Sequence, residues 1–302
     1  MQSSTSILLS PDGTRLSLRR WLPDAPLDQV RGTVEIAHGM GEHSGRYARL
    51  AGAFAAAGWA TYAHDQRGHG HTALGEDETG PSEPGKPGLG DLGPAGWDGL
   101  VGDLATVNDH VQQAHPGVVH VLLGHSMGSF AAQQFVLDHS REIDGLVLSG
   151  TTAVDVAATV LDPDAGTDLT ALNAAFAPAR TDYDWLSRDD AEVDRYVADP
   201  LCGFGLDPEG TRSLIAAAPR LADPEALAGI RPDLPVYLVA GSADPLNLEL
   251  AMLAMVVDRY REAGLTDLTT DYHEGARHEV FNETTRDEVT ANLLAWLERL
   301  TS

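Results

Sequence analysis

The stretch that decides the fold is VLLGHSMGSF, residues 121–130, in which an apolar run breaks at a Gly-x-Ser-x-Gly pattern. We interpret it as a strand, a sharp turn and a helix, because small and aromatic residues resume after the second glycine. Gly124 and Gly128 carry no side chain where strand and helix crowd together, so Ser126 can adopt strained backbone angles. A serine hydroxyl is a poor nucleophile until a base takes its proton, and such a turn lifts Ser126 above the strand ends toward partners elsewhere in the chain.

Length, composition and net charge limit the class of protein to which this chain can belong. The 302 residues can form one large domain or two small ones. The formal net charge of -25 argues against nonspecific attraction to nucleic acid or to anionic membranes. No stretch approaches the roughly 20 apolar residues of a membrane helix, and the first residues lack a signal region. Cys202 is the only cysteine, so no internal disulfide is possible. We expect a cytoplasmic protein with no nucleic-acid partner and leave its oligomeric state open.

Apolar stretches alternate with amphipathic ones through much of the chain, which predicts strands that alternate with helices. A hairpin is expected first, at residues 6–22. Further strands are expected at residues 32–37, 59–64, 118–123, 143–149, 235–240 and 268–272. Helices are expected at residues 46–58 and 96–113, after Ser126 and at the end of the chain. This order is typical of an α/β fold with a mostly parallel central sheet, an antiparallel edge and helices on both faces.

The alternation stops between residues 151 and 227, where no strand is convincing. The short helices expected there are at residues 169–176, 191–197 and 211–221. We interpret residues 151–227 as a helical cap, or lid, inserted over the carboxyl ends of the strands, with residues 1–150 and 228–302 as the core. Ligands of open α/β sheets bind at those ends, so an insertion after a strand can cover the site.

Several separated motifs point to one family. They are HGMGEHSGRY at residues 38–47, DQRGHGHT at 65–72, HSMG at 125–128, GSADP at 241–245 and GARHE at 275–279. Together they resemble the monoacylglycerol lipase and lysophospholipase-like branch of the α/β-hydrolases, the serine aminopeptidase S33 type. Two positions depart from the usual pattern, since Ser129 stands where glycine is common and Thr72 where serine is common. The resemblance covers nearly the whole chain and implies the α/β-hydrolase fold with an inserted helical cap.

The resemblance also implies a catalytic triad of Ser126, Asp244 and His278, in the chain order of α/β-hydrolases. Asp244 follows an apolar strand, and its task would be to hold the imidazole of the base in the correct tautomer. His278 lies in a loop before the closing helix. His273 is the rival base, still close to the last strand, and the Gly-x-x-His-Glu pattern favours His278.

Acyl transfer passes through an oxyanion that needs two hydrogen-bond donors. The resemblance of residues 38–47 to an oxyanion loop assigns one donor to the backbone amide of Met40. The amide of Met127 is the second, because it follows the nucleophile. We interpret His38 as a strand-end histidine hydrogen-bonded to neighbouring loops rather than as a base.

The loop at residues 65–72 has an architectural interpretation, in which glycines permit a tight return and Asp65 pairs with Arg67. A metal site is the alternative, because His64, His69 and His71 lie near Asp65. A metallohydrolase would need further ligands at definite spacings and would leave the serine motif unexplained. We therefore expect no metal and no cofactor.

Other positions are interpreted as packing. The residues expected to pack the cap onto the core, with substrate contact as the alternative, are Trp185, Leu201 and Phe204. Those expected to form the buried stripe of a late helix are Leu248, Met252, Met255 and Val256. Cys202 is interpreted as a buried apolar residue. Residues 74–94 show no periodicity and are interpreted as a loop that borders the pocket mouth.

These features predict a serine hydrolase that cleaves carboxylic esters through an acyl-enzyme. The resemblance implies monoacylglycerol or lysophospholipid-type lipids as substrates. An amidase, peptidase or thioesterase would use the same triad and stays an alternative. Epoxide hydrolases and dehalogenases of this fold use an aspartate nucleophile, so Ser126 disfavours them. A non-catalytic ligand-binding protein on a hydrolase scaffold is the remaining alternative.

Overall fold

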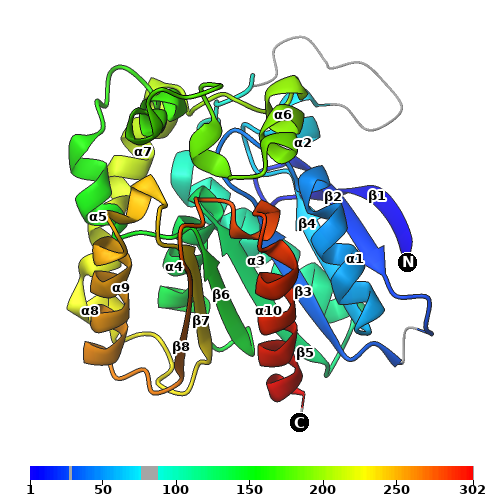
Figure 1. Ribbon diagram of the computed structural model, residues 1–302. Helices are drawn as coiled ribbons and strands as arrows, with labels where there is room; N and C mark the ends of the chain where they lie inside the picture. The colour runs from blue at the N-terminus through cyan, green and yellow to red at the C-terminus, as the bar shows by residue number, and fades with distance from the viewer. Residues whose placement is uncertain (27–28, 76–87, 302) are drawn as a thin grey trace.

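The centre of the computed structural model, which describes residues 1–26, 29–75 and 88–301, is an eight-stranded sheet. Its strands are β1 (Gln2–Leu9), β2 (Arg15–Leu22), β3 (Gly32–Ala37), β4 (Trp59–His64), β5 (Val119–His125), β6 (Gly145–Ser149), β7 (Val236–Gly241) and β8 (Leu268–His273). They lie in the order β1-β2-β4-β3-β5-β6-β7-β8 (Figure 1). β2 pairs antiparallel with both β1 and β4, and the other neighbours are parallel. The predicted sheet and its antiparallel edge are confirmed, and the hairpin begins at Gln2 rather than at Ser6.

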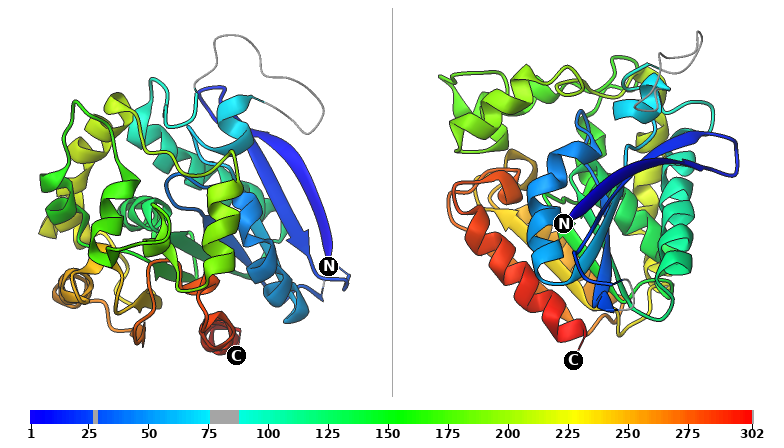
Figure 2. Two further views of the ribbon diagram at one scale, coloured as in Figure 1. Left: turned by 45° about the horizontal axis from the view of Figure 1, so that its top comes forward. Right: turned by 90° about the vertical axis from the view of Figure 1, so that its right-hand side faces the viewer.

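Helices cover both faces of the sheet (Figure 2, right). One face carries α1 (Ala48–Ala56) and α10 (Arg286–Leu300). The other carries α3 (Gly96–Ala114), α4 (Met127–His139) and α9 (Ala251–Glu262). Successive side chains of a strand point to opposite faces, so Val121 and Leu123 join one core cluster and Leu122 the other. The continuous apolar run before Ser126 is explained by this double burial.

The segment between β6 and β7 is helical, as predicted. Its elements are α5 (Val154–Ala157), η3 (Ala158–Val160), η4 (Leu169–Phe176), η5 (Asp184–Leu186), α6 (Asp190–Ala198), α7 (Pro208–Ala217), η6 (Ala218–Ala222) and α8 (Pro224–Leu227). Aspartates start several of them: the Asp189 and Asp207 side chains accept hydrogen bonds from the first backbone amides of α6 and α7. Figure 1 shows α6 and α7 at the top of the view, above the strands. We propose residues 151–227 as the cap on this basis.

Two further expectations from the sequence concern the loop at residues 74–94 and the lack of a membrane-spanning helix. Of the loop expected at residues 74–94, residues 76–87 lie outside the described residues. Within the described ranges, the structure holds no helix with the length and apolar character needed to cross a membrane.

Truncating a residue of the α1 contact tests the assignment of the core. Phe54 is fully buried between α1 and the sheet, so Phe54→Ala should lower the free energy of unfolding by about 3–5 kcal/mol. The matched control is Leu9→Ala, because Leu9 is 62% exposed on β1 and its loss should cost less than about 0.5 kcal/mol. Urea denaturation of both variants measures the difference, and equal effects would contradict the packing described here.

Candidate active site

The turn between β5 and α4 has the strand, turn and helix geometry that the sequence predicts. Ser126 lies between the two elements with φ 50° and ψ -123°, an unusual conformation for a residue with a side chain. A Cβ on Gly124 would lie 2.5 Å from the Gly128 carbonyl oxygen, and a Cβ on Gly128 would collide with the carbonyl oxygen of Ala37. Both glycines are therefore required for the close approach of β3, β5 and α4 that presents Ser126.

His278 and Asp244 form a buried pair near this turn. The His278 Nδ1 atom lies 2.9 Å from Asp244 Oδ2, and each residue is 1% exposed. The Asp244 carboxylate also accepts hydrogen bonds from Leu246 N and Asn247 Nδ2, which fix its orientation. Burial alone would lower the pKa of His278, but the charge and hydrogen bond of Asp244 raise the pKa above its ordinary value. Within the described residues, His278 Nε2 is buried and has no hydrogen-bond partner.

The backbone around Met40 and Met127 lies beside Ser126. All three residues line one cavity. Met127 is the first residue of α4, so its amide has no acceptor within the helix and can donate to a ligand. Met40 follows β3, whose last residue, Ala37, pairs with Gly124 of β5. The sheet therefore brings both predicted donors to the same edge.

Two other histidines that the sequence singles out have different partners. His38 Nδ1 bonds to the Gly39 carbonyl oxygen at 2.8 Å, and Gln66 N donates to His38 Nε2 at 2.9 Å. Both ring nitrogens are thus engaged with loops, as predicted. His273 Nε2 lies 3.1 Å from Asp271 Oδ2 at the end of β8, whereas His278 is the histidine paired with Asp244.

The loop at residues 65–72 is architectural, although one predicted contact is wrong. The Asp65 carboxylate accepts hydrogen bonds from Ser44 and from the His71 amide. Arg67 does not form the expected pair with Asp65: its guanidinium binds Asp103 at 2.6 Å and also contacts Asp12. Asp103 is fully buried on α3 and offers a stronger, bidentate partner for the guanidinium.

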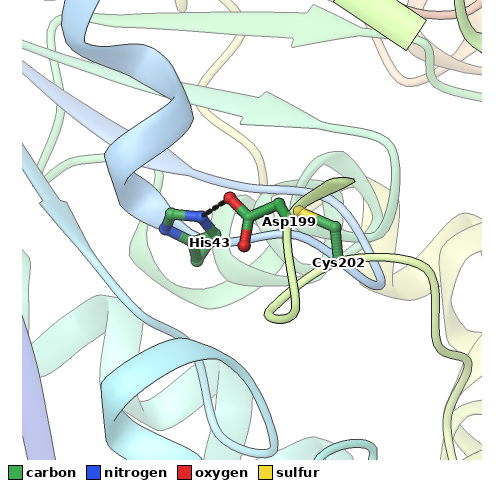
Figure 3. Close-up of side chains that lie close together, drawn as sticks. All are labelled: His43, Asp199 and Cys202. Atoms are coloured by element: carbon green, nitrogen blue, oxygen red, sulfur yellow. Dashed lines mark hydrogen bonds and ion pairs between the residues drawn. The ribbon is translucent and has the colours of Figure 1, made fainter. Parts of the chain in front are cut away.

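The possible metal ligands that come together in the described part of the chain are His43, Asp199 and Cys202 (Figure 3). Their donor atoms all lie within 4.8 Å of one another. The Gly45 amide donates to His43 Nδ1 at 3.2 Å, so Nε2 carries the hydrogen and donates to Asp199 at 3.0 Å. In a metal-bound histidine, one ring nitrogen binds the metal and the other carries the hydrogen and donates it to a neighbouring acceptor. If His43 Nε2 bound a metal, Nδ1 would have to donate a hydrogen bond, but it accepts one from the Gly45 amide. The cluster fits a hydrogen-bonded contact between the cap and the loop after β3.

Cys202 is half-buried rather than fully buried, which corrects the expectation for this residue. It packs beside the aromatic cluster of Trp185 and Tyr196. Burial raises the pKa of the Cys202 thiol, so the thiolate that cysteine chemistry requires is disfavoured.

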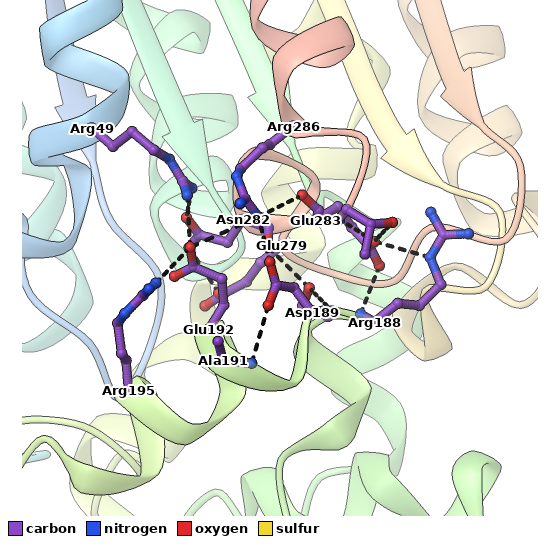
Figure 4. A network of polar contacts seen from close by, with 12 residues as sticks. Arg49, Arg188, Asp189, Ala191, Glu192, Arg195, Glu279, Asn282, Glu283 and Arg286 are labelled. Carbon is purple, nitrogen blue, oxygen red and sulfur yellow. Dashed lines mark hydrogen bonds and ion pairs between the residues drawn. The ribbon is translucent and has the colours of Figure 1, made fainter.

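Ion pairs attach the helical segment to the core near the site (Figure 4). Glu192 of α6 binds Arg49 of α1 at 2.6 Å. Asp189, at the start of α6, binds Arg286 of α10 at 2.5 Å. Backbone bonds add to these contacts, because the Glu279 amide donates to the Leu186 carbonyl at 2.8 Å. The α6 side of the proposed cap is therefore held against the loop that carries His278.

The cavity at Ser126 has a volume of about 380 Å³ and is lined mainly by apolar side chains. Trp185 is buried and lines this cavity, with its ring centroid 4.9 Å from that of His278, so it serves both packing and the site. Phe204 instead packs against His69. The predicted stripe after β7 is partly wrong: Met252 and Val256 are buried, but Leu248 and Met255 are exposed.

The reason for the error at Leu248 is local backbone geometry. Leu248, Glu249 and Leu250 have φ values of 44°, 55° and 70°, and α9 begins only at Ala251. This left-handed segment precedes the helix, so Leu248 lines the cavity rather than the core. Sequence periodicity did not reveal the segment, because none of its residues is a glycine.

Comparisons with known proteins agree with this architecture. The monoacylglycerol lipase of Mycolicibacterium smegmatis is 32% identical over 288 residues, which cover 94% of this chain and 93% of that protein. The monoglyceride lipase of Homo sapiens is 31% identical over 288 residues, covering 91% and 84%. A solved structure, a highly thermostable carboxyl esterase from Bacillus coagulans in complex with glycerol, has a TM-score of 0.84, 26% identity and full coverage of both chains.

A sequence model of the family described as serine aminopeptidase, S33, matches residues 28–285. The match spans far more than half of the chain, and the TM-score of 0.84 with the solved esterase shows that the two chains share their overall fold. The chain therefore belongs to the serine aminopeptidase S33 family and has the α/β-hydrolase fold.

Proposed function

We propose that this carboxylic ester hydrolase cleaves monoacylglycerol-type lipid esters with a triad of Ser126, His278 and Asp244. The observation that carries the proposal is the buried pair of His278 with Asp244. That pair leaves His278 Nε2 without a partner among the described residues. Ser126, presented by a strained turn at an apolar cavity, supplies the hydroxyl that this nitrogen would deprotonate.

The proposed reaction has two steps. His278 takes the hydroxyl proton as Ser126 Oγ attacks the ester carbonyl carbon, and the oxyanion accepts hydrogen bonds from the Met40 and Met127 amides. Collapse of this intermediate breaks the bond to the alcohol, which leaves with the proton from His278. Water, deprotonated by His278, then attacks the acyl carbon, the bond to Ser126 Oγ breaks, and the proton returns from His278 to Oγ as the fatty acid is released. Asp244 stabilises the imidazolium in both steps.

The cavity supports a substrate with an apolar acyl chain. Its volume of about 380 Å³ lies within the range of about 300–1,000 Å³ typical of small-molecule sites. The side chains that supply its apolar lining include Phe130, Leu172, Leu214 and Met252. Two relatives are named for the hydrolysis of monoacylglycerols, which favours this class over lysophospholipids.

The alternatives can be separated by matched substrates. An amidase, peptidase or thioesterase would use the same residues, and the family description names an aminopeptidase. Hydrolysis of an ester, a thioester and an amide with one common acyl chain ranks these activities. A non-catalytic binding protein would bind the acyl chain and turn over none of them.

Covalent labelling tests the nucleophile. A fluorophosphonate should add one adduct to the wild-type protein, because an activated serine attacks phosphorus as it attacks a carbonyl. Ser126→Ala should remove the adduct. The matched control is Ser129→Ala, three residues later in α4, which should keep it. Intact-mass spectrometry reads the result, and an adduct that survives in Ser126→Ala would refute the assignment.

The pH dependence tests the base. His278 must be neutral to accept a proton, and its pKa is raised, so kcat/KM for a soluble ester should fall as the pH drops through a value above about 6.5. Asp244→Asn should lower kcat by about 10⁴-fold, because the imidazole loses its orienting partner. Asp271→Asn, the matched change beside His273, should leave the profile unchanged. A profile that responds to Asp271→Asn and not to Asp244→Asn would assign the base to His273.

Filling the cavity tests the acyl site. Leu172 is half-buried on its wall, so Leu172→Trp should reduce kcat/KM for long-chain monoacylglycerols by roughly tenfold or more and spare p-nitrophenyl acetate. Leu201→Trp makes the same change at a residue of the proposed cap that is not among those lining the cavity, and it should affect neither substrate. Equal losses on long and short esters in Leu172→Trp would place the acyl chain elsewhere.

A further inference from the structure

Glu42 is a buried carboxylate in the turn that follows β3, and the reaction proposed above gives it no role. It is 3% exposed. Its Oε1 atom accepts a hydrogen bond from Gly39 N at 2.5 Å and another from the Tyr47 hydroxyl at 2.8 Å. The hydrogen bond between Glu42 and Gly39 thus closes a short turn, in which Met40 and Gly41 are the two central residues. The conformation of the Met40 amide depends directly on this closure.

The turn lies directly against the nucleophile. A Cβ on Gly39 would lie 2.9 Å from Glu42 Oε1 and 3.1 Å from Ser126 Cβ. The glycine backbone is therefore sandwiched between the carboxylate and the serine. Any loosening of the contact between Glu42 and Gly39 would move the turn relative to Ser126, and active-site rates are sensitive to shifts of about 1 Å.

Arg46 connects Glu42 to the loop that carries the base. Its Nη1 atom donates to Glu42 Oε2 at 2.7 Å and to Glu279 Oε1 at 2.5 Å, and its Nη2 atom donates to Glu279 Oε2 at 2.8 Å. Glu279 directly follows His278 in the chain. One buried guanidinium therefore joins the turn of Met40 to the loop of His278.

The carboxylate of Glu42 is ionised in this setting. Burial alone would raise its pKa, but the Arg46 guanidinium, the neighbouring histidines and the hydrogen bond from Gly39 together outweigh burial, and the pKa is lowered to about 2. The hydrogen bonds to the turn are consequently charge-assisted and stronger than those of a neutral acceptor. A contact of this kind can hold a backbone amide in place without touching the substrate.

We propose that Glu42 is a positioning residue for acyl transfer, which fixes the Met40 turn beside Ser126 and, through Arg46, ties that turn to the His278 loop. The inference rests on the proposed function, because it takes Met40 as an oxyanion donor. It assigns to Glu42 an effect on the rate of acylation rather than on substrate binding. Interactions that matter only in the transition state change kcat more than KM.

Two substitutions at Glu42 separate its hydrogen bond from its charge. Glu42→Ala removes both, and should lower kcat for a soluble ester by about 100-fold with KM changed by less than about threefold. Glu42→Gln keeps an oxygen acceptor for Gly39 N, and should recover roughly tenfold of this loss. The rate at which Ser126 reacts with a fluorophosphonate, forming a phosphonyl-enzyme and releasing fluoride, should show the same order among the variants.

The negative charge of Glu42 can be tested separately through the pH dependence of kcat/KM. The titratable groups that face His278 are Asp244, Glu279, Glu42 and His125. The negative charge of Glu42 helps to raise the pKa of His278, so Glu42→Gln should move the acidic limb of kcat/KM to lower pH. This shift reports the charge alone, so the fall in kcat at an unchanged KM is the result that a residue stabilising only the fold would not give.

The matched control is Asp103→Asn on α3. This change removes another buried carboxylate from an ion pair with an arginine, in this case Arg67. It should lower the melting temperature and leave kcat and the acidic limb unchanged. Should Glu42→Ala fail to fold, kcat and KM of the folded Glu42→Gln variant decide the question, because a positioning role lowers kcat and leaves KM within about threefold.

Three results would overturn the inference. They are wild-type kcat in Glu42→Ala, a loss in KM alone, and equal kcat in the alanine and glutamine variants with an unmoved acidic limb. A wild-type protein that fails to react with the fluorophosphonate would overturn the proposed function as well. A reactive wild type with fully active Glu42 variants would overturn the inference alone.

Discussion

Close backbone packing at the turn around Ser126 is the constraint on which the rest of the site depends. The backbone of α4 approaches β3 so closely that a Cβ on Gly128 would collide with Ala37, and Gly124 has no room for a side chain either. This packing fixes the start of α4 against the ends of two parallel strands. The Met127 amide and the Ser126 hydroxyl therefore have one relative position, set by the sheet rather than by flexible loops.

Charge near this turn is buried and paired, in a chain whose surface is strongly acidic. The Asp244 carboxylate raises the pKa of His278, and Arg46 binds the carboxylates of Glu42 and Glu279. Removing one partner of a buried pair leaves an uncompensated charge, so such pairs resist rearrangement. These pairs orient His278 and connect its loop to the turn that holds Met40.

Much of the fold could be predicted from local sequence patterns. The apolar run and the glycines around Ser126 predicted the strand and the sharp turn, which are encoded within a few neighbouring residues. The alternation of strands and helices along the chain predicted the parallel sheet, and its interruption at residues 151–227 predicted the helical insertion. The pairing of His278 with Asp244 was reached only through resemblance to a known family. Periodicity alone would have left it undecided, since the chain is rich in acids.

Contacts between distant side chains could not be read in this way. His43 and Asp199 meet although they lie far apart in the chain, and no local pattern links them. Arg67 selects Asp103 over the nearer Asp65 because the fold buries Asp103 beside it. Leu248 leaves the core because a left-handed segment delays the helix. In each case tertiary packing, rather than propensity, decides the outcome.

The proposed mechanism requires Ser126 to attack a carbonyl whose oxygen is held by the Met40 and Met127 amides. A crystal structure of the protein after reaction with an alkyl fluorophosphonate tests it most directly. We expect phosphorus bonded to Ser126 Oγ, the phosphoryl oxygen about 2.7–3.1 Å from both amide nitrogens, and the alkyl chain in the cavity beside Trp185. Phosphorus on another residue, or a phosphoryl oxygen turned away from both amides, would contradict it.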